Sequence, residues 1–224
     1  MNSPNKIVII GDGFIGCSVY SYLINANYNV SIFNRHNLND LIDQLSHIDC
    51  QLILNCSGIG HPSLLDTNPI EYNRELDHIN RIIDIAYKYK IFLIQFSSAA
   101  ACGYNYDFDE KIYPINVNNT LYGKLKCHVE NNIYNKLDEK TYVILRLFSV
   151  YGVGLKKQLF FDLYTKYQKN EHQFQLNSIL DERNFISISD VLQSTEFIIK
   201  NKISKSVINI SNDKPIKISS AIGI

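Results

Sequence analysis

The chain has 224 residues, with 22 Lys and Arg against 22 Asp and Glu, so its formal net charge is zero. A neutral chain lacks the basic field that holds nucleic acid or an anionic membrane, so any phosphate must be bound locally. No stretch approaches about 18 apolar residues and no charged leader precedes a long apolar run, so we expect neither membrane insertion nor export. The five cysteines show no Cys-x-x-Cys spacing and no partnering His cluster, which predicts a cytoplasmic protein without a metal site.

Apolar runs rich in β-branched residues alternate with helical segments along most of the chain. The expected strands are Lys6–Ile10, Asn29–Phe33, Leu52–Cys56, Ile91–Phe96 with its continuation to Ser98, and Tyr142–Leu147. The expected helices are Cys17–Asn25, 38–45, about 69–88, Leu121–Leu137, about 159–168 and about 190–200. This alternation predicts an α/β fold, a parallel sheet of the Rossmann type with helices on both faces. Ligands of such sheets bind at the carboxyl ends of the strands.

The predicted organisation is one compact unit in two parts. Residues 1–152 are expected to form a dinucleotide-binding domain with a doubly wound parallel sheet, and residues 153–224 a small substrate lobe. About 17 residues separate Phe33 from Gln51, too few for the helix, strand and second helix that usually follow the second strand. We therefore expect one strand with its crossover helix to be missing there.

A glycine motif, Gly11-x-Gly13-x-x-Gly16, lies between the first strand and the first helix. Glycines at this place let the backbone turn tightly and approach a pyrophosphate at the helix N-terminus. The motif, with the intervening Phe14 and Ile15, indicates a dinucleotide site. A tight turn in an unrelated α/β fold is the alternative interpretation.

The second expected strand ends in Asn34 and Arg35, where an NAD site usually offers Asp or Glu to the adenosine ribose. No carboxylate occupies this position. Arg35 could pair with a 2′-phosphate, which favours NADP over NAD as the cofactor. A solvated arginine in a turn is the alternative.

Tyr122 and Lys126 lie four residues apart on an expected helix that follows the strand ending in Ser98. Residues four apart share one helix face, so the ammonium lies beside the phenol and stabilises its phenolate. Such a pair is equipped for proton transfer. The spacing alone also arises by chance, so its position after the serine-ended strand carries the interpretation.

With these features in this order, the chain resembles the short-chain dehydrogenase/reductase superfamily, and more narrowly its extended branch of nucleotide-sugar epimerases, dehydratases and reductases. Three further segments are similar to motifs of that branch: Ser97–Gly103, Arg146–Gly152 and Arg183–Val191. The resemblance implies that Ser98 hydrogen-bonds the substrate oxygen. It implies that Tyr122 transfers the proton and that Lys126 binds the nicotinamide ribose. Counting back from Gly103 aligns Ser98, and not Ser97, with the family's serine.

Other positions are assigned by the same resemblance. Cys56, Ser57 and Gly58 stand where the family packs small residues on the cofactor, although a buried strand end would look the same. Arg183 resembles the arginine that binds the diphosphate of a nucleotide sugar, with a structural ion pair as the alternative. Ser149 replaces the usual Asn at a substrate contact.

The resemblance also narrows the chemistry. Ala99 and Ala100 stand where 4,6-dehydratases of the branch carry Asp-Glu, so dehydration is not expected. The short region after the second strand and the NADP-like arginine favour a ketoreductase. The serine with its alanines looks more like a 4-epimerase, and a dinucleotide-binding regulator without turnover is a third hypothesis. The resemblance implies a homodimer. Because the chain stops soon after Ser211, we expect a reduced substrate lobe.

Overall fold

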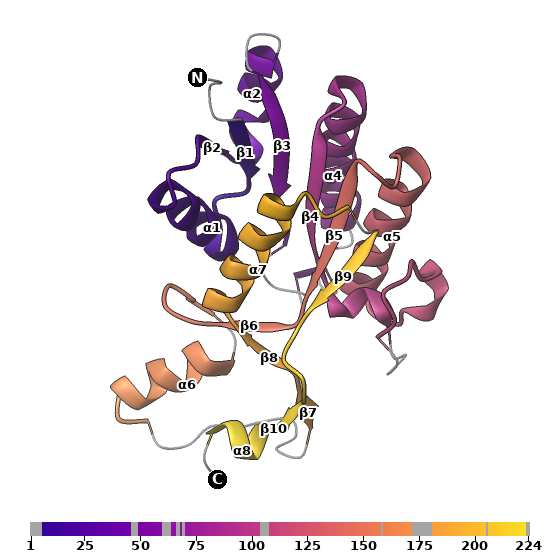
Figure 1. Cartoon of the computed structure of the whole chain (residues 1–224). Helices are drawn as coiled ribbons and strands as arrows, with labels where there is room; N and C mark the ends of the chain where they lie inside the picture. The colour runs from indigo at the N-terminus through magenta and orange to yellow at the C-terminus, as the bar shows by residue number, and fades with distance from the viewer. Residues whose placement is uncertain are drawn as a thin grey trace.

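A six-stranded sheet forms the centre of the computed structural model, which describes residues 6–45, 49–59, 64–65, 68, 70–103, 108–157, 159–171, 181–204 and 206–222. The strand order is β2-β1-β3-β4-β5-β9, and every neighbouring pair is parallel (Figure 1). The strands are β1 (Lys6–Ile10), β2 (Val30–Phe33), β3 (Cys50–Asn55), β4 (Phe92–Ser98), β5 (Tyr142–Leu147) and β9 (Val207–Ile210). The predicted Rossmann-type fold is confirmed.

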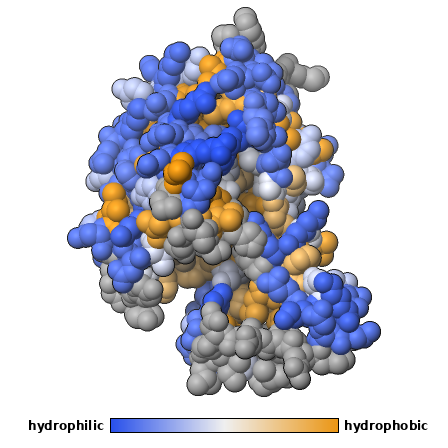
Figure 2. Space-filling model, turned by 180° about the vertical axis from the view of Figure 1, so that it is seen from behind, coloured by the Kyte–Doolittle hydropathy of each residue, from blue (hydrophilic) through white to orange (hydrophobic). Residues whose placement is uncertain are grey.

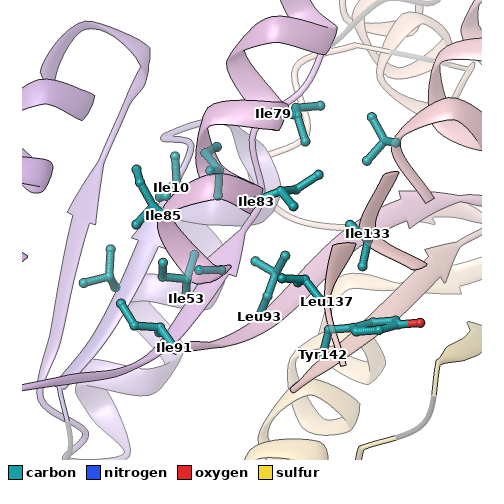
Figure 3. Close-up of a cluster of buried hydrophobic side chains, with 14 of the residues drawn as sticks. Ile10, Ile53, Ile79, Ile83, Ile85, Ile91, Leu93, Ile133, Leu137 and Tyr142 are labelled. Atoms are coloured by element: carbon teal, nitrogen blue, oxygen red, sulfur yellow. The ribbon is translucent and has the colours of Figure 1, made fainter. Parts of the chain in front are cut away.

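Helices cover both faces of this sheet because successive strand residues point to opposite sides. Ile7 and Ile9 pack with α1 (Phe14–Asn25) and α7 (Ile188–Asn201) on one face. Val8 and Ile10 pack on the other face, which is covered by α2 (Leu38–Leu45), α4 (Ile70–Tyr89) and α5 (Leu121–Lys136). Figure 3 shows this second core layer, in which isoleucines of α4 and α5 meet the strand side chains.

The sheet ends early on the side of β2. Between β2 and β3, the described residues form only a short 3-10 helix, η1 (Arg35–Asn37), and α2. In the described part of the chain, β2 is therefore an edge strand with β1 as its neighbour. The expected loss of one strand and its crossover helix is confirmed there.

A small lobe lies beyond the sheet, in the lower part of Figure 1. It contains the parallel pair β6 (Ser149–Tyr151) and β8 (Phe185–Ser187), the antiparallel pair β7 (Glu182–Arg183) and β10 (Ile216–Lys217), and the helices α6 (Leu159–Gln168) and α8 (Ile218–Ile222). Hydrophobic residues are visible where the body narrows toward this lobe (Figure 2). Two elements from the stretch assigned to the lobe, α7 and β9, instead complete the body. A division at residue 152 would therefore assign β9, a strand of the central sheet, to the lobe.

Helix α5 is tied to the sheet by an ion pair with no exposed side-chain surface, between Arg146 of β5 and Glu130. The guanidinium donates two hydrogen bonds to the carboxylate, at 2.5 and 3.0 Å, and Ser97 of β4 donates a third at 2.6 Å. Two further Arg146 N–H groups donate to the carbonyls of Asp109 and Lys111 at 3.0 and 2.7 Å. Because each charge is paired and hydrogen-bonded, this buried network is stable and fixes α5 to β4 and β5.

Replacing Glu130 by Ala should be far more costly than breaking an ion pair on the surface. The variant leaves the Arg146 guanidinium buried without its charge partner, so we expect a loss of about 3–5 kcal/mol in the free energy of unfolding. Asp84→Ala breaks the exposed pair with Lys136 on the neighbouring helices and should cost about 1 kcal/mol or less. Urea denaturation measures both. Similar losses in the two variants would contradict the anchoring role of Glu130.

Candidate active site

The structure brings the predicted acid/base residues to one end of the sheet. Ser98 is the last residue of β4, and its hydroxyl accepts a hydrogen bond from the backbone N–H of Ala100 at 3.2 Å. Tyr122 and Lys126 lie on the first turns of α5, with Lys126 Nζ 5.6 Å from the centre of the Tyr122 ring. The lysine is buried and the tyrosine is half-buried. The ammonium therefore faces the phenol, as their spacing predicts.

The first turn of α5 is held against η2 (Ala99–Cys102), the segment that follows the strand-end serine. Thr120 caps the helix by accepting a hydrogen bond from the Gly123 N–H at 3.1 Å. Asn118 Nδ2 donates to the carbonyl of Ala101 at 3.0 Å. A Cβ atom on Gly123 would lie 2.8 Å from the Ala100 carbonyl oxygen and would overlap the Asn118 amide. Only glycine permits this close approach, which fixes the tyrosine-bearing turn beside the serine.

The glycines of the first loop have different structural roles. Gly11 has φ +107°, and a Cβ there would lie 2.6 Å from the Ser57 nitrogen, while a Cβ on Gly16 would overlap the Gly11 carbonyl oxygen. These two glycines are required for packing. At Gly13, by contrast, no described atom lies within 4 Å of an added Cβ, and no side chain caps the N-terminus of α1 there. Open space beside free helix N–H groups fits the pyrophosphate of a dinucleotide.

A small-residue segment after β3 borders this loop and is held by buried amides. Asn55 donates to Gln95 Oε1 at 2.8 Å and accepts hydrogen bonds from Ser57 N and Oγ at 3.1 and 2.6 Å. The Cys56 side chain lies beside Gly16. Burial raises the pKa of the Cys56 thiol, so it is neutral at physiological pH. The segment Cys56–Gly58 thus offers small, uncharged groups beside the glycine loop.

Both residues at the end of β2 are already engaged. Asn34 Nδ2 donates to Asp12 Oδ2 at 2.9 Å, which joins β2 to the glycine loop. Arg35 forms an ion pair with Glu75 of α4, and the glutamate is buried whereas the arginine is partly exposed. Sequence alone predicted Arg35 to be available to a phosphate, but the structure gives this guanidinium a carboxylate partner.

The predicted substrate residues lie on the lobe. The Ser149 N–H on β6 donates to the Asn184 carbonyl at 3.0 Å, and the neighbouring Arg183 on β7 is exposed. Arg183 forms no ion pair with the residues that the structure describes. An added Cβ on Gly154 would lie 3.6 Å from the Phe14 ring, so the loop after β6 reaches the glycine loop. The two halves of the expected site therefore adjoin each other.

Sequence reasoning missed three residues that shape this region. Thr120 precedes the helix and is of a type favoured as an N-cap, so a local signal existed for it. Asn118 and Glu75 act across the fold, and Glu75 is 40 residues from its partner Arg35, so no local pattern identifies them.

Within the described ranges, no helix is long and apolar enough to cross a membrane. No three His, Cys, Asp or Glu side chains of those ranges are grouped to bind a metal.

The model of the NAD dependent epimerase/dehydratase family matches residues 7–211. The UDP-N-acetylglucosamine 4-epimerase of Methanobrevibacter ruminantium, solved with UDP-N-acetylmuramic acid, aligns at a TM-score of 0.80 and 19% identity, over 99% of this chain and 81% of that one. A dTDP-4-dehydrorhamnose reductase from Clostridium acetobutylicum aligns at 0.77 and 17%, over 98% and 81%. The dTDP-glucose 4,6-dehydratase of Bacillus anthracis, in complex with NAD, aligns at 0.74 and 15%, over 98% and 81%. Among curated proteins, the comparison found no match.

Two alanine substitutions in the glycine loop should separate folding from ligand binding. Gly16→Ala forces a Cβ onto the Gly11 carbonyl oxygen, so it should lower the temperature of thermal unfolding. Gly13→Ala meets no neighbour and should leave that temperature nearly unchanged. Its methyl group occupies the open space, however, so dinucleotide affinity in a fluorescence titration should fall by about tenfold or more. Unchanged affinity in Gly13→Ala would show that no dinucleotide binds there.

Proposed function

The chain belongs to the NAD-dependent epimerase/dehydratase family, and within that family we propose that it reduces a keto group of a nucleotide sugar. When bound, the nicotinamide cofactor supplies the hydride for this reaction. The observation that carries the proposal is the approach of Lys126 to the Tyr122 ring, on a helix turn packed against the segment after Ser98. A protein that only bound a dinucleotide would not need this arrangement.

In the proposed reaction, the Ser98 hydroxyl donates a hydrogen bond to the carbonyl oxygen of the substrate. As hydride adds to the carbonyl carbon, the Tyr122 phenol gives its proton to that oxygen, which becomes a hydroxyl group. The ammonium of Lys126 stabilises the phenolate that remains. Because Lys126 is buried, water screens this interaction little, and the stabilisation is stronger than it would be on the surface.

The proposed substrate class rests on the lobe and on the family. Arg183 is exposed at the lobe, where a guanidinium can bind a diphosphate through two parallel hydrogen bonds. Ser149, on β6, pairs with Phe185 of β8, two residues after Arg183 in the chain. Family neighbours act on nucleotide sugars, as their names state. A homodimer and a cytoplasmic location stay predictions from the sequence.

Epimerisation is the second candidate, because the serine segment with its alanines resembles that of a 4-epimerase. The helical turn after Ser98 begins with Ala99 and Ala100, which have no acid or base to eliminate water, so dehydration is disfavoured while both hydride-transfer reactions remain open. In an epimerase, the keto intermediate turns in the site and takes the hydride back on its other face. The substrate then changes configuration with no net consumption of reduced cofactor.

Tyr122→Phe should abolish the chemistry while leaving the cofactor site intact. The variant loses the proton donor, so we expect kcat to fall by about a hundredfold or more, with little change in dinucleotide affinity. Oxidation of NADH and NADPH in the presence of a panel of keto nucleotide sugars measures the rate. Tyr134→Phe is the matched control, since Tyr134 is an exposed tyrosine of the same helix and should keep full activity.

The other outcomes separate the hypotheses. Equal activity of wild type and Tyr122→Phe would refute the mechanism. Interconversion of two sugars without any change in nicotinamide absorbance would identify an epimerase. Saturable dinucleotide binding without conversion of any substrate would identify a regulator.

A further inference from the structure

The reaction proposed above leaves one buried charge without a role, the carboxylate of Glu75 on α4. This residue has no exposed surface. One of its oxygens, Oε2, pairs with Arg35, and the other, Oε1, is buried and has no hydrogen-bond partner among the residues that the structure describes. A buried acceptor left unpaired costs about 1–3 kcal/mol, so a hydrogen-bond donor that reached Oε1 would stabilise the site.

The unpaired oxygen lies beside Gly58, in the segment that is expected to contact the cofactor. An added Cβ on Gly58 would lie 3.9 Å from Glu75 Oε1 and 3.3 Å from Lys126 Nζ. The carboxylate therefore adjoins the small-residue segment after β3, and the lysine ammonium lies near the same glycine. Through Arg35 it also reaches the end of β2. Glu75 thus connects two parts of the site that are far apart in the sequence.

The charges around Glu75 define what it can bind. Arg35 pairs with it and offsets its charge, and the Lys126 ammonium also lies near Gly58. His78, one turn further along α4, adds no charge, because burial and the positive charges of Arg35 and Arg81 lower its pKa to about 4. An anion that approached Arg35 would thus also approach a buried carboxylate, whereas a hydroxyl group could donate to it.

We propose that Glu75 is a specificity-determining residue that makes this site prefer NAD over NADP, an inference that rests on the dinucleotide site of the proposed function. A 2′-phosphate needs a cation free to pair with it. Arg35, the cation at the end of β2, is held by Glu75, and the carboxylate repels a phosphate brought to the same place. A ribose hydroxyl carries no charge and can supply a hydrogen bond. The sequence favours NADP only because the partner of Arg35 is remote in the chain.

Replacing the charge without changing the shape tests the proposal. We would measure the dissociation constants of NADH and NADPH by fluorescence titration, for wild type and for Glu75→Gln. Wild type should bind NADH about tenfold or more tightly than NADPH. Glu75→Gln frees Arg35 and removes the repulsion. The ratio of the two dissociation constants should therefore change in favour of NADPH by about tenfold or more. The double variant Glu75→Gln with Arg35→Ala should lose this shift, because the phosphate then has no cation.

The matched control lies on the same helix. Glu71 forms an exposed ion pair with Arg74, so Glu71→Gln removes the same charge type from α4 without touching Arg35. The ratio of its dissociation constants for NADH and NADPH should equal that of wild type. Circular dichroism and thermal unfolding establish that each variant is folded, and Glu75→Met, of similar length and uncharged, replaces Glu75→Gln if the latter does not fold.

Each result decides the matter. Wild type that binds NADPH as tightly as NADH, or a folded uncharged variant at position 75 with an unchanged ratio, overturns the role of Glu75. A change of the same size in Glu71→Gln also overturns it, because the loss of any negative charge from α4 would then explain the change in cofactor preference. Wild type that binds neither dinucleotide instead refutes the proposed function, so the two failures are distinguishable.

Discussion

The buried ion pair between Arg146 and Glu130 is the constraint on which the rest of the site depends. Glu130 follows Lys126 by four residues and Tyr122 by eight, so the three side chains lie along one face of α5. Anchoring the last of them to β4 and β5 turns that whole face toward the carboxyl end of the sheet. The orientation of the phenol and the ammonium is thus set by a contact two turns away from the phenol.

Polar groups in the interior gather at one end of the sheet. The strands β3, β4 and β5 are apolar over most of their length, and most of their buried polar side chains, Asn55, Ser97 and Arg146, come at or near the last residues. Each of these is hydrogen-bonded, so burial costs little. The apolar part of the strands supplies stability, and the polar ends shape the loops that meet a ligand. The same strands therefore serve the core and the site.

Patterns within short segments predicted most of the body. Apolar runs gave the bounds of β1 and β5, and helical periodicity gave those of α2 and α6. The short strands of the lobe have two or three residues each, too few for any pattern, and the pairing of β9 with β5 depends on a partner far along the chain. The proximity of Tyr122 and Lys126 could be predicted because both residues lie on one helix. Glu75 and Asn118 act through contacts between distant segments, which a single sequence does not reveal.

The fit of Gly123 against Ala100 and Asn118 fixes how closely the first turn of α5 packs on the body, because even one methyl group has no room at that contact. The proposed proton donor therefore lies on a turn that is closely packed on the body. Under the proposed function, selection among sugars of different size then falls to the lobe, which is joined to the body by short strands and loops. A change of substrate would call for a new lobe on an unaltered body.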